Sequence, residues 1–365
     1  MSILIVKNEL MKVALILPAE PEMAPYIHYY INVLKKECVN YNLIAWNRSG
    51  KNSRITSNMI MYDSVSPDTA SYIEKMRGYI GFTRFVKKQL KSVEYDLVVI
   101  HTILPAVLMK RFLIRNYEKR YVLDIRDRGS LFGLWKHQFS KLLSSSVFNV
   151  ISSPGFKQWL PKSNFYLSHN IGLNGLKGVC LDKEIQFGGK ITILSIGQIR
   201  FYEANKYVID SLANNSRFGL HYAGFGPDSE RLQLYCSQNH ISNVIFSGRY
   251  MKKDEPEILG SCDFINIVFP KTSGTLSAMP NRFYGAAIFR KPVIVTSGSV
   301  QAEYVKKYGT GIILDENVEL QKQIENYIAS FDSERFVMGC DAFLSEVAKD
   351  NECFENQLIG VIRKL

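Results

Sequence analysis

The side chains of residues 269–305, and the order in which they occur, suit the binding of phosphate. The stretch opens with small and polar residues over 271–277, which we expect to form a loop. Pro280 then favours the first turn of a helix, because the N–H that proline lacks is one that a helix leaves unpaired anyway. The helix is predicted to run to about Phe289, and a buried strand over 292–296 follows it.

A polar loop that leads into a helix offers free backbone N–H groups and the positive end of the helix dipole to an anion. Lys271 and Arg282 add two positive charges, and Asn281 lies beside Arg282 on the first turn. We therefore predict a pocket for the phosphates of a bound nucleotide. The loop residues assigned to phosphate contact are Ser273, Gly274 and Thr275. The alternatives are a plain solvent-facing loop and an Arg282 that extends to solvent.

A second group of candidates lies at strand ends in the first half of the sequence. His101 ends one apolar segment of strand length, and Arg126 and Asp127 follow another that ends at Ile125. Ligands of parallel α/β sheets bind at the carboxyl ends of the strands. We predict that Asp127, Arg126 and His101 are catalytic, with Asp127 placed to take a proton. A salt-linked turn and a structural histidine are the alternatives.

Short apolar segments alternate with amphipathic segments along the chain, which predicts an α/β protein with parallel sheets and helices on both faces. Its 365 residues suffice for two domains. We predict an N-terminal Rossmann-like domain over 1–170, a Gly- and Asn-rich linker over 171–189, and a second Rossmann-like domain over 190–345. A C-terminal helix over 346–365 follows, with packing back on the first domain as one option.

Two finer expectations concern helices. Residues 104–116 are predicted to form one helix. The last part of the chain is predicted to form two helices, over 333–348 and 353–365.

The composition narrows the range of partners. A formal net charge of +11 favours anionic partners, namely nucleic acid, a phosphate-rich ligand or an anionic membrane leaflet. No nucleic-acid module signature is present, so nucleic acid is the least favoured of these. The six cysteines are widely separated and no two histidines have metal-ligand spacing, so we expect neither a metal site nor disulfides. No apolar run reaches the ~18 residues of a membrane span, and we expect a cytoplasmic protein.

The predicted helix over 72–91 combines aromatic and basic residues. Each cation near an anionic bilayer contributes about 1 kcal/mol to binding, so this helix is a candidate for peripheral contact with the inner face of the cell membrane. A basic face that is simply solvated is the alternative. The basic residues are Arg77, Arg84, Lys87, Lys88 and Lys91.

Five segments of the second half follow one another in a familiar order: 195–200, 223–227, 244–249, 280–295 and 302–305. Together they resemble the nucleotide-sugar domain of GT-B glycosyltransferases, closest to the retaining enzymes of family 4. In the first half the resemblance is less specific and extends to His101, to 124–127 and to 168–170. It implies a GT-B fold, that is, two Rossmann-like domains that face a cleft.

The resemblance also implies a reaction. Such enzymes move a sugar from a nucleotide sugar of UDP or GDP type to a glycan or lipid-linked acceptor in cell-surface polysaccharide synthesis, with retention of configuration. They need no metal and no cofactor beyond the nucleotide-sugar substrate. In the resembling family, the positions of Arg200 and Lys206 hold the diphosphate. The alternative is that both are ordinary surface cations.

The remaining donor contacts follow from the same resemblance. They are Gly197, Gly224 and Gly226 at strand ends, Gly248 and Arg249 beside the base, and Glu303 facing the cleft. For the glycines, strand-to-helix turns are the alternative explanation. For Glu303, the alternative is a first-turn acid that the helix dipole favours.

One departure from the family pattern bears on function. These enzymes carry two glutamates eight positions apart, but here Gly285 stands at the second and Ser277 near the first, and residues 264–302 contain no acid. Ribose must then be bound by other groups, or the activity is weak, or the nucleotide differs. A non-catalytic GT-B accessory subunit is therefore an alternative function. A sugar-nucleotide epimerase is less favoured, because the second half supplies few acidic and histidine groups.

Overall fold

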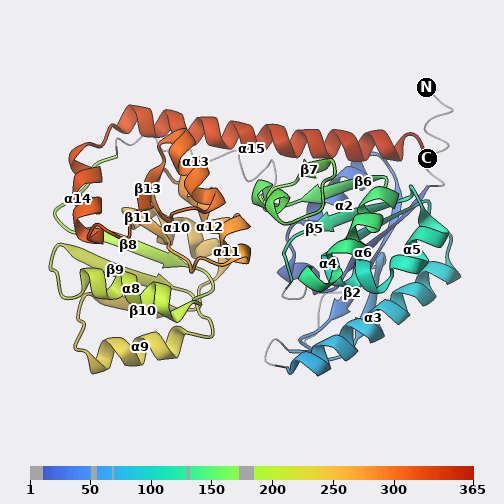
Figure 1. The fold of residues 1–365 in the computed structure, drawn as a ribbon, viewed down its shortest axis with the longest axis horizontal. Coiled ribbons are helices and arrows are strands. Elements are labelled where there is room, and N and C mark those ends of the chain that lie inside the picture. Colours follow the sequence, from blue (N-terminus) through green and yellow to red (C-terminus); the bar gives the residue numbers. More distant parts are fainter. Residues whose placement is uncertain (1–10, 51–55, 68–69, 130–131, 172–184) are drawn as a thin grey trace. The chain divides into compact units, whose positions relative to one another are not determined.

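The computed structural model describes residues 11–50, 56–67, 70–129, 132–171 and 185–365 (Figure 1). The chain divides into two compact units. Unit 1 comprises residues 1–172 and 349–365, and unit 2 comprises residues 173–348. Most of the predicted linker lies outside the described residues.

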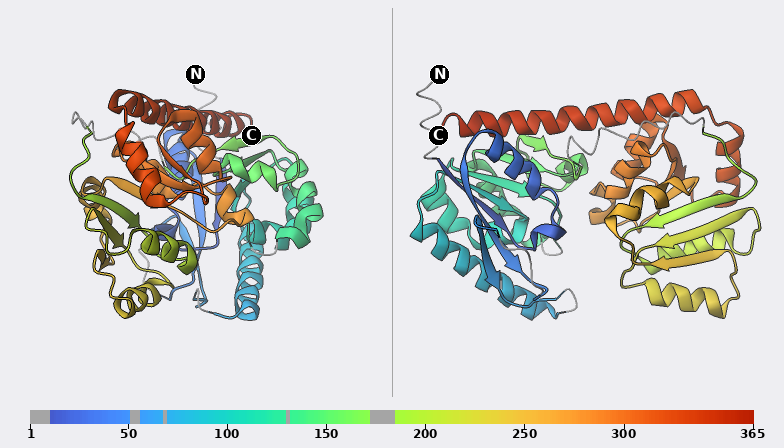
Figure 2. Two further views of the ribbon diagram at one scale, coloured as in Figure 1. Left: turned by 60° about the vertical axis from the view of Figure 1, so that its left-hand side comes forward. Right: turned by 180° about the vertical axis from the view of Figure 1, so that it is seen from behind.

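Unit 1 contains a parallel sheet of seven strands in the order β3-β2-β1-β4-β5-β6-β7, flanked by helices (Figure 2). The strands are β1 (Lys12–Leu17), β2 (Asn40–Asn47), β3 (Met59–Asp63), β4 (Leu97–His101), β5 (Tyr121–Ile125), β6 (Phe148–Ile151) and β7 (Phe165–Leu167). The central strands β4 and β5 are buried along their whole length, which is typical of parallel sheets covered on both faces. The helices are α2 (Ile27–Lys36), α3 (Tyr72–Ser92), α4 (Ile103–Leu108), α5 (Lys110–Tyr117) and α6 (Phe132–Ser145), with 3-10 turns η1 (Pro21–Met23) and η2 (Pro154–Gln158).

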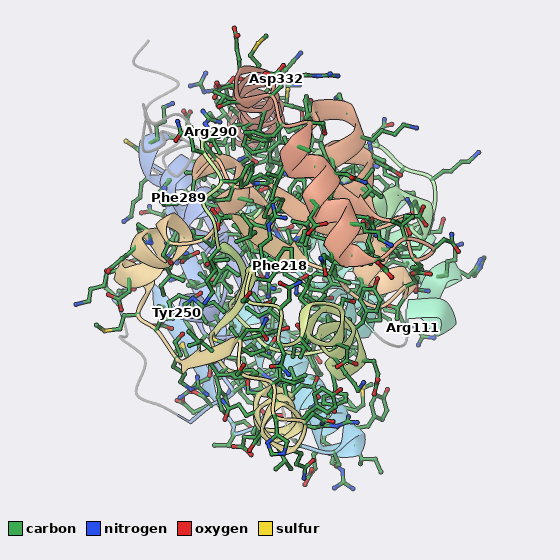
Figure 3. All side chains as sticks on the ribbon, turned by 90° about the vertical axis from the view of Figure 1, so that its left-hand side faces the viewer. Arg111, Phe218, Tyr250, Phe289, Arg290 and Asp332 are labelled. Carbon is green, nitrogen blue, oxygen red and sulfur yellow. The ribbon has the colours of Figure 1, made fainter. Side chains whose placement is uncertain are left out.

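Unit 2 contains a parallel sheet of six strands in the order β10-β9-β8-β11-β12-β13. The strands are β8 (Ile191–Ile196), β9 (Phe218–Ala223), β10 (Val244–Gly248), β11 (Phe264–Ile267), β12 (Val293–Thr296) and β13 (Gly311–Leu314). The core side chain Phe218 is fully buried within this unit (Figure 3). The helices are α8 (Tyr202–Leu212), α9 (Ser229–Gln238), η3 (Lys252–Asp254), α10 (Glu255–Gly260), α11 (Ser273–Ser277), α12 (Asn281–Ile288), α13 (Val300–Tyr308), α14 (Leu320–Ala329) and α15 (Ser333–Ile362).

The strand order of each sheet fixes where a ligand is expected. In unit 1 the chain order reverses between β1 and β4, and in unit 2 it reverses between β8 and β11. Loops that follow such strands diverge, and ligands of doubly wound sheets bind at this carboxyl edge. The two-sheet α/β fold predicted from the alternation of segments is confirmed.

The end of the chain differs from the prediction of two helices. Residues 333–362 form the single helix α15, which contributes to both units. The polar residues between the two predicted helices continue the helix, and Asn351 among them is buried and hydrogen-bonded within unit 1. The apolar residues of α15 that enter the core of unit 1 are Phe354, Leu358, Val361 and Ile362.

Other differences are local. Residues 104–116 form two helices, α4 and α5, which meet at Met109, and not one. Strands β3 and β13 and helix α6 were not predicted, because the strands are short and α6 lies in a segment without a clear start signal. None of the helices in the described residues is both long and apolar enough to span a membrane.

Helix α3 is held against the sheet by close backbone contact. Its first turn carries a capping box, in which Ser71 and Glu74 exchange side-chain-to-backbone hydrogen bonds of 3.3 and 2.8 Å. A Cβ atom added at Gly78 would lie 2.6 Å from the Trp46 ring, and one at Gly81 would lie 2.3 Å from the Tyr62 hydroxyl. The helix therefore approaches the sheet only because both positions lack a side chain.

This contact predicts the outcome of Gly78→Ala. Trp46 is fully buried, so the ring has no room to move away from a methyl group. We expect the free energy of unfolding to fall by about 1–3 kcal/mol, as in other overpacked cores. The measurement is urea denaturation followed by tryptophan fluorescence. Gly360→Ala in α15 is the matched control, because a Cβ there meets no described atom within 4 Å outside its helix. That variant should gain about 0.4–1 kcal/mol, and equal stability of the two variants would contradict the prediction.

Candidate functional site

Three strand ends of unit 2 are joined through their backbones. The N–H of Gly197, which follows β8, donates to the carbonyl of Ala223 at 2.8 Å. The N–H of Gly224, which follows β9, donates to the carbonyl of Gly248 at the same distance. The three glycines have φ angles of 100°, 137° and 72°, a region that side chains disfavour. The carboxyl edge of this sheet is therefore a fixed backbone platform.

The glycines after β9 allow an unusually close approach of two loops. A Cβ atom at Gly224 would lie 1.8 Å from the carbonyl oxygen of Gly197, and one at Gly226 would lie 2.0 Å from that of Ile199. Both residues therefore have a packing role, whether or not a ligand also contacts them. That Gly224 and Gly226 also contact the donor stays a prediction.

Arg200 leaves this platform at the turn between β8 and α8. The next residue, Phe201, has a left-handed backbone conformation with a φ of 71°, which is rare for a bulky side chain. The Asn205 amide supports the turn by donating to the carbonyls of Arg200 and Phe201 at 2.8 and 3.0 Å. Arg200 itself is exposed, and its guanidinium lies 4.9 Å from the Phe201 ring centroid.

Arg282, on the first turn of α12, points to the same loops. Its guanidinium donates weakly to the carbonyls of Asn266 and Gln198, at 3.3 and 3.4 Å. Burial lowers the pKa of Arg282 to about 10, and the positive charge of Arg200 adds to this decrease. Neither arginine forms an ion pair within the described part of the chain. The structure thus brings together two cations, Arg200 and Arg282, whose mutual repulsion an anion would relieve.

The segment before α12 is not the loop that the sequence predicts. Residues 273–277 form the short helix α11, because Thr272 caps it by accepting from the Thr275 N–H at 3.3 Å. The Thr275 hydroxyl bonds to the carbonyl of Pro270, whereas Ser273 is exposed and Gly274 is half-buried. Lys271 pairs with Glu316 at 3.0 Å, so its charge is compensated within unit 2.

The other predicted donor residues are exposed or engaged in side-chain contacts. Lys206 pairs with Asp210 one helical turn away, at 2.5 Å, and lies 4.7 Å from the Tyr235 ring. Asn281 and Glu303 are both exposed. Arg249 lies with its guanidinium 4.9 Å from the ring centroid of Phe225, a residue that the sequence did not single out. The sequence alone does not show which aromatic side chains are exposed, because burial depends on the fold.

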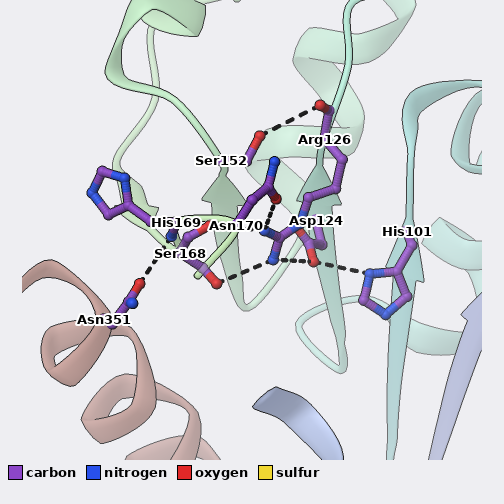
Figure 4. Close-up of polar contacts among 8 residues, drawn as sticks. All are labelled: His101, Asp124, Arg126, Ser152, Ser168, His169, Asn170 and Asn351. Atoms are coloured by element: carbon purple, nitrogen blue, oxygen red, sulfur yellow. Dashed lines mark hydrogen bonds and ion pairs between the residues drawn. The ribbon is translucent and has the colours of Figure 1, made fainter. Parts of the chain in front are cut away.

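In unit 1, the carboxyl edge of the sheet holds a buried network around Asp124 (Figure 4). His101 Nδ1 lies 2.9 Å from one carboxylate oxygen, and Arg126 Nε lies 2.7 Å from the other. Arg126 also donates to the carbonyl of Ser168 at 2.7 Å and to the side-chain oxygen of Asn170 at 3.2 Å. The guanidinium therefore fastens the end of β5 to the segment that follows β7.

The charges of this network stabilise one another. Burial alone would raise the pKa of Asp124, but Arg126 and the hydrogen bond from His101 outweigh it and hold that pKa below the ordinary value. Burial lowers the pKa of His101 despite the carboxylate, so the imidazole is neutral at pH 7 and donates from Nδ1. Arg126 also lies 4.3 Å above the Tyr26 ring, a contact with no signal in the sequence.

The three predicted catalytic residues are therefore not equivalent. His101 has no exposed surface, and the side chain of Arg126 is only 5% exposed. Both act in this structure as positioning groups for Asp124 and the loops around it. Asp127 reaches solvent, yet the surrounding protein still raises the pKa of its carboxyl by desolvation. Of the three side chains, that of Asp127 is the exposed one, and a catalytic role for it stays a prediction.

Helix α15 contributes to the same edge of unit 1. Asn351 accepts from the N–H of His169 at 2.9 Å and donates to the carbonyl of Ile171 at 2.7 Å. His169 Nε2 lies 3.1 Å from Asp350. These contacts, which periodicity does not reveal, tie residues 168–171 to the helix. Within the described residues, no group of three His, Cys, Asp or Glu side chains could hold a metal ion.

Comparison with protein families places a known domain in unit 2. Residues 181–335 match the family described as Glycosyl transferases group 1. The expected resemblance to GT-B glycosyltransferases is thereby confirmed, whereas the assignment to family 4 stays a prediction. A search against curated proteins found no match.

Solved structures extend the similarity to nearly the whole chain. A sucrose-phosphate synthase from Thermosynechococcus elongatus is 14% identical with a TM-score of 0.72, over 97% of this chain and 98% of that chain. HepE of Anabaena, in complex with UDP, is 13% identical with a TM-score of 0.68, over 96% and 99%. The lipopolysaccharide outer core galactosyltransferase WaaB in its apo form is 15% identical with a TM-score of 0.61, over 96% and 99%. At these identities the likeness shows the fold, which is GT-B as predicted.

The buried imidazole predicts a pH dependence of stability. In the unfolded chain His101 takes up a proton below about pH 6.5, but in the folded protein its pKa is lower. The unfolded state therefore binds more protons as the pH falls from 7 to 5, and the free energy of unfolding decreases by up to about 1.4 kcal/mol per pH unit. The stabilising effect of the Asp124 carboxylate is retained in this range, since it is lost only below its ordinary pKa of 3.8.

His101→Asn tests this dependence, because the amide keeps a donor for Asp124 but does not titrate. Urea denaturation at pH 7 and pH 5 should show a shallower pH dependence for the variant than for the wild type. His240→Asn, at an exposed position with a φ of 51°, is the control and should keep the wild-type dependence. An equal decrease in the free energy of unfolding from pH 7 to pH 5 in the wild type and His101→Asn would contradict the prediction.

Proposed function

We propose that this chain, which has the GT-B fold and a group 1 glycosyl transferase domain in unit 2, transfers a sugar from a nucleotide sugar to a glycan or lipid-linked acceptor. The observation that carries the proposal is the pair Arg200 and Arg282, two cations at the carboxyl edge of the sheet that have no counter-ion among the described residues. A diphosphate supplies the missing negative charge. The donor is of UDP or GDP type, and structures of HepE with UDP and with UDP-glucose support the first of these.

The reaction breaks the bond between the anomeric carbon and the terminal phosphate oxygen of the donor. Negative charge then develops on the leaving diphosphate, and preorganised guanidinium groups stabilise such charge more strongly in the transition state than in the ground state. We assign this role to Arg282 and Arg200, with Lys206 joining them if its pair with Asp210 opens. In this proposal the cations replace a metal, and the sugar keeps its anomeric configuration.

The acceptor hydroxyl must lose a proton when it bonds to the anomeric carbon. Asp127 is the candidate base in unit 1, because it reaches solvent and its raised pKa brings the carboxyl closer to the operating pH. The leaving phosphate is the other possible acceptor of this proton.

A non-catalytic accessory role is the competing proposal. It is favoured by one observation, the lack of any acid over 264–302 on the elements that border the two arginines. A chain that had lost its donor site would have no use for two uncompensated cations, so we rank it second.

The arginine pair predicts that replacing either arginine weakens nucleotide binding without lowering the stability of the unliganded protein. Arg282→Ala and Arg200→Ala should weaken UDP binding about 10- to 100-fold, the range expected for lost charged hydrogen bonds. The unliganded protein should be no less stable, because each change removes a repulsion. Thermal unfolding with and without UDP and GDP measures both effects, since a ligand at 100 times its Kd adds about 2.7 kcal/mol.

Arg217→Ala is the matched control for this experiment. Arg217 is an exposed arginine of unit 2 that pairs with Glu325, away from the strand ends. It should bind both nucleotides like the wild type. If well-folded wild-type protein is stabilised by neither nucleotide, the accessory role gains and the transferase proposal fails.

We further propose that α3 binds an anionic membrane surface on the cytoplasmic side. Four exposed cations at spacings of seven, four and three residues share one helical face. Ile73, which is 63% exposed, continues this face at the start of the helix. Burial lowers the pKa of Lys87, and the charges of Arg84 and Lys91 add to the effect, so the face is crowded with positive charge. The four cations are Arg77, Arg84, Lys88 and Lys91.

Exposed apolar side chains beside a cationic face suit the boundary between lipid headgroups and acyl chains. Tyr72 and Val65 are exposed near the start of α3, and Glu74, the one acid of this helix, is engaged in the capping box. Such a surface would hold the enzyme where lipid-linked acceptors are found.

Charge reversal on α3 tests the membrane proposal. Arg84→Glu combined with Lys88→Glu should abolish most sedimentation with vesicles that contain phosphatidylglycerol, at about 1 kcal/mol per charge removed. Neither the wild type nor the variant should bind vesicles of phosphatidylcholine alone. Arg231→Glu with Lys253→Glu changes the net charge equally on exposed positions of unit 2 and should leave binding intact. Equal loss in both double variants would point to net charge alone.

A further inference from the structure

A groove lies at the edge of the unit 1 sheet opposite to the candidate site. Tyr95 precedes β4 and Arg120 precedes β5, so both lie at the amino ends of these strands. The last turns of α3 and α5 flank the groove, and the Tyr117 hydroxyl joins them by donating to the carbonyl of Leu90 at 3.2 Å (Figure 1). We call it the amino-edge groove; it holds about 200 Å³, and its polar lining residues are Lys91, Glu94, Tyr95, Asn116, Tyr117 and Arg120.

The neutral polar side chains of the amino-edge groove have already donated their hydrogens. The Tyr95 hydroxyl donates to the side-chain oxygen of Asn42 at 2.9 Å, and the Asn116 amide donates to a backbone carbonyl one turn earlier in α5 at 2.7 Å. Burial raises the pKa of Tyr95 to about 12 and also raises that of Tyr117, so both hydroxyls keep their protons. These groups therefore offer a ligand only oxygen lone pairs, and the carboxyl ends of two helices add partial negative charge.

Three charged side chains border this acceptor surface, namely Lys91, Glu94 and Arg120. The first two are exposed, whereas Arg120 is half-buried with its guanidinium 5.3 Å from the Tyr117 ring centroid. Arg120 donates to the carbonyl of Asn116 at 2.8 Å. Within the part of the chain that the structure describes, none of the three charges forms an ion pair, although Lys91 and Glu94 are three positions apart. A ligand that matches this set carries an anion and a hydrogen-bonding cation together.

The size and place of the groove restrict the ligand further. Its volume is below the roughly 300–1,000 Å³ of pockets for drug-sized ligands, so it suits a small head group. Lys91 belongs both to the groove and to the cationic face of α3 that we propose to contact a bilayer. A phosphoethanolamine head group has a phosphate and a primary ammonium with three N–H donors. Phosphocholine lacks these donors, and phosphoglycerol lacks the cation.

We infer that the amino-edge groove binds the phosphoethanolamine head group of a membrane phospholipid. The phosphate contacts Lys91 and Arg120, and the ammonium donates to the carboxylate of Glu94 and to the tyrosine oxygens. The inference rests on the proposed membrane contact of α3 and adds a preference for one head group to it. Because the groove is at the amino edge of the sheet, a lipid bound there leaves the carboxyl edge free for substrates.

Titration of the full chain with three soluble probes, followed by NMR, tests the inference. The probes are sn-glycero-3-phosphoethanolamine, sn-glycero-3-phosphocholine and sn-glycerol 3-phosphate. The wild type should bind the first at least about threefold more tightly than the other two. Glu94→Gln should weaken binding of the first about fivefold, the upper range for an exposed ion pair, and bind sn-glycerol 3-phosphate no less tightly, because a repelling charge is gone. Glu352→Gln removes the same charge from an exposed position of α15 and should behave like the wild type.

Sedimentation with vesicles separates the groove from the cationic face of α3. Replacing phosphatidylcholine by phosphatidylethanolamine, at a constant content of phosphatidylglycerol, should increase binding of the wild type and of Glu352→Gln about twofold or more. Glu94→Gln should lose this increase yet still bind the phosphatidylglycerol vesicles, since the variant is more positive.

Two results would overturn the groove while leaving the contact of α3 intact. One is an equal response of the wild type and Glu94→Gln to phosphatidylethanolamine. The other is equal affinity of the wild type for the phosphoethanolamine and phosphocholine probes. Binding of the soluble probe by a wild type that sediments with none of the vesicles contradicts the membrane contact of α3, and with it the lipid as the occupant of the groove.

Discussion

The direct contact between the backbones of the β8 and β9 loops is the constraint on which the rest of unit 2 depends. It exists only because Gly224 and Gly226 lack side chains, and it sets the loops of three neighbouring strands in one register. Arg200, Phe225 and Arg249 all project from these loops. A ligand that contacts several of them meets groups whose positions are already fixed, so little conformational entropy remains to be lost on binding.

Each sheet has an arginine at its carboxyl edge, and the partners of its charge indicate whether the arginine stabilises the fold or is available to a ligand. Arg126 is surrounded by partners, with a carboxylate, three further oxygen acceptors and an aromatic face. Its charge is compensated within unit 1. Arg282 donates two long hydrogen bonds to carbonyls and lies 5.5 Å from the Phe269 ring centroid, but it has a neighbouring positive charge and, within the described residues, no ion-pair partner. A buried charge without an acid costs free energy unless an external anion is present.

The sequence was informative where a property depends on neighbours along the chain. Alternating apolar segments predicted both sheets, and the order of the glycine-containing strand ends predicted the fold. It was less informative where a property depends on distant residues. His101 is enclosed by Tyr26 and Tyr30, Asn351 by a segment 180 residues away, and the exposure of Phe225 follows from loop packing. The helix at 273–277 was missed because Thr272 caps it within a segment of poor helix formers.

Unit 1 is discontinuous in the chain, and this affects the order in which the protein is made. Residues 349–362 of α15 fill the core of unit 1 with Phe354 and Leu358, and Asn351 closes its hydrogen-bond network. During synthesis, the whole of unit 2 leaves the ribosome before these residues do. The nascent N-terminal part must therefore wait with an apolar face of its sheet uncovered, while the unit encoded later completes its core first.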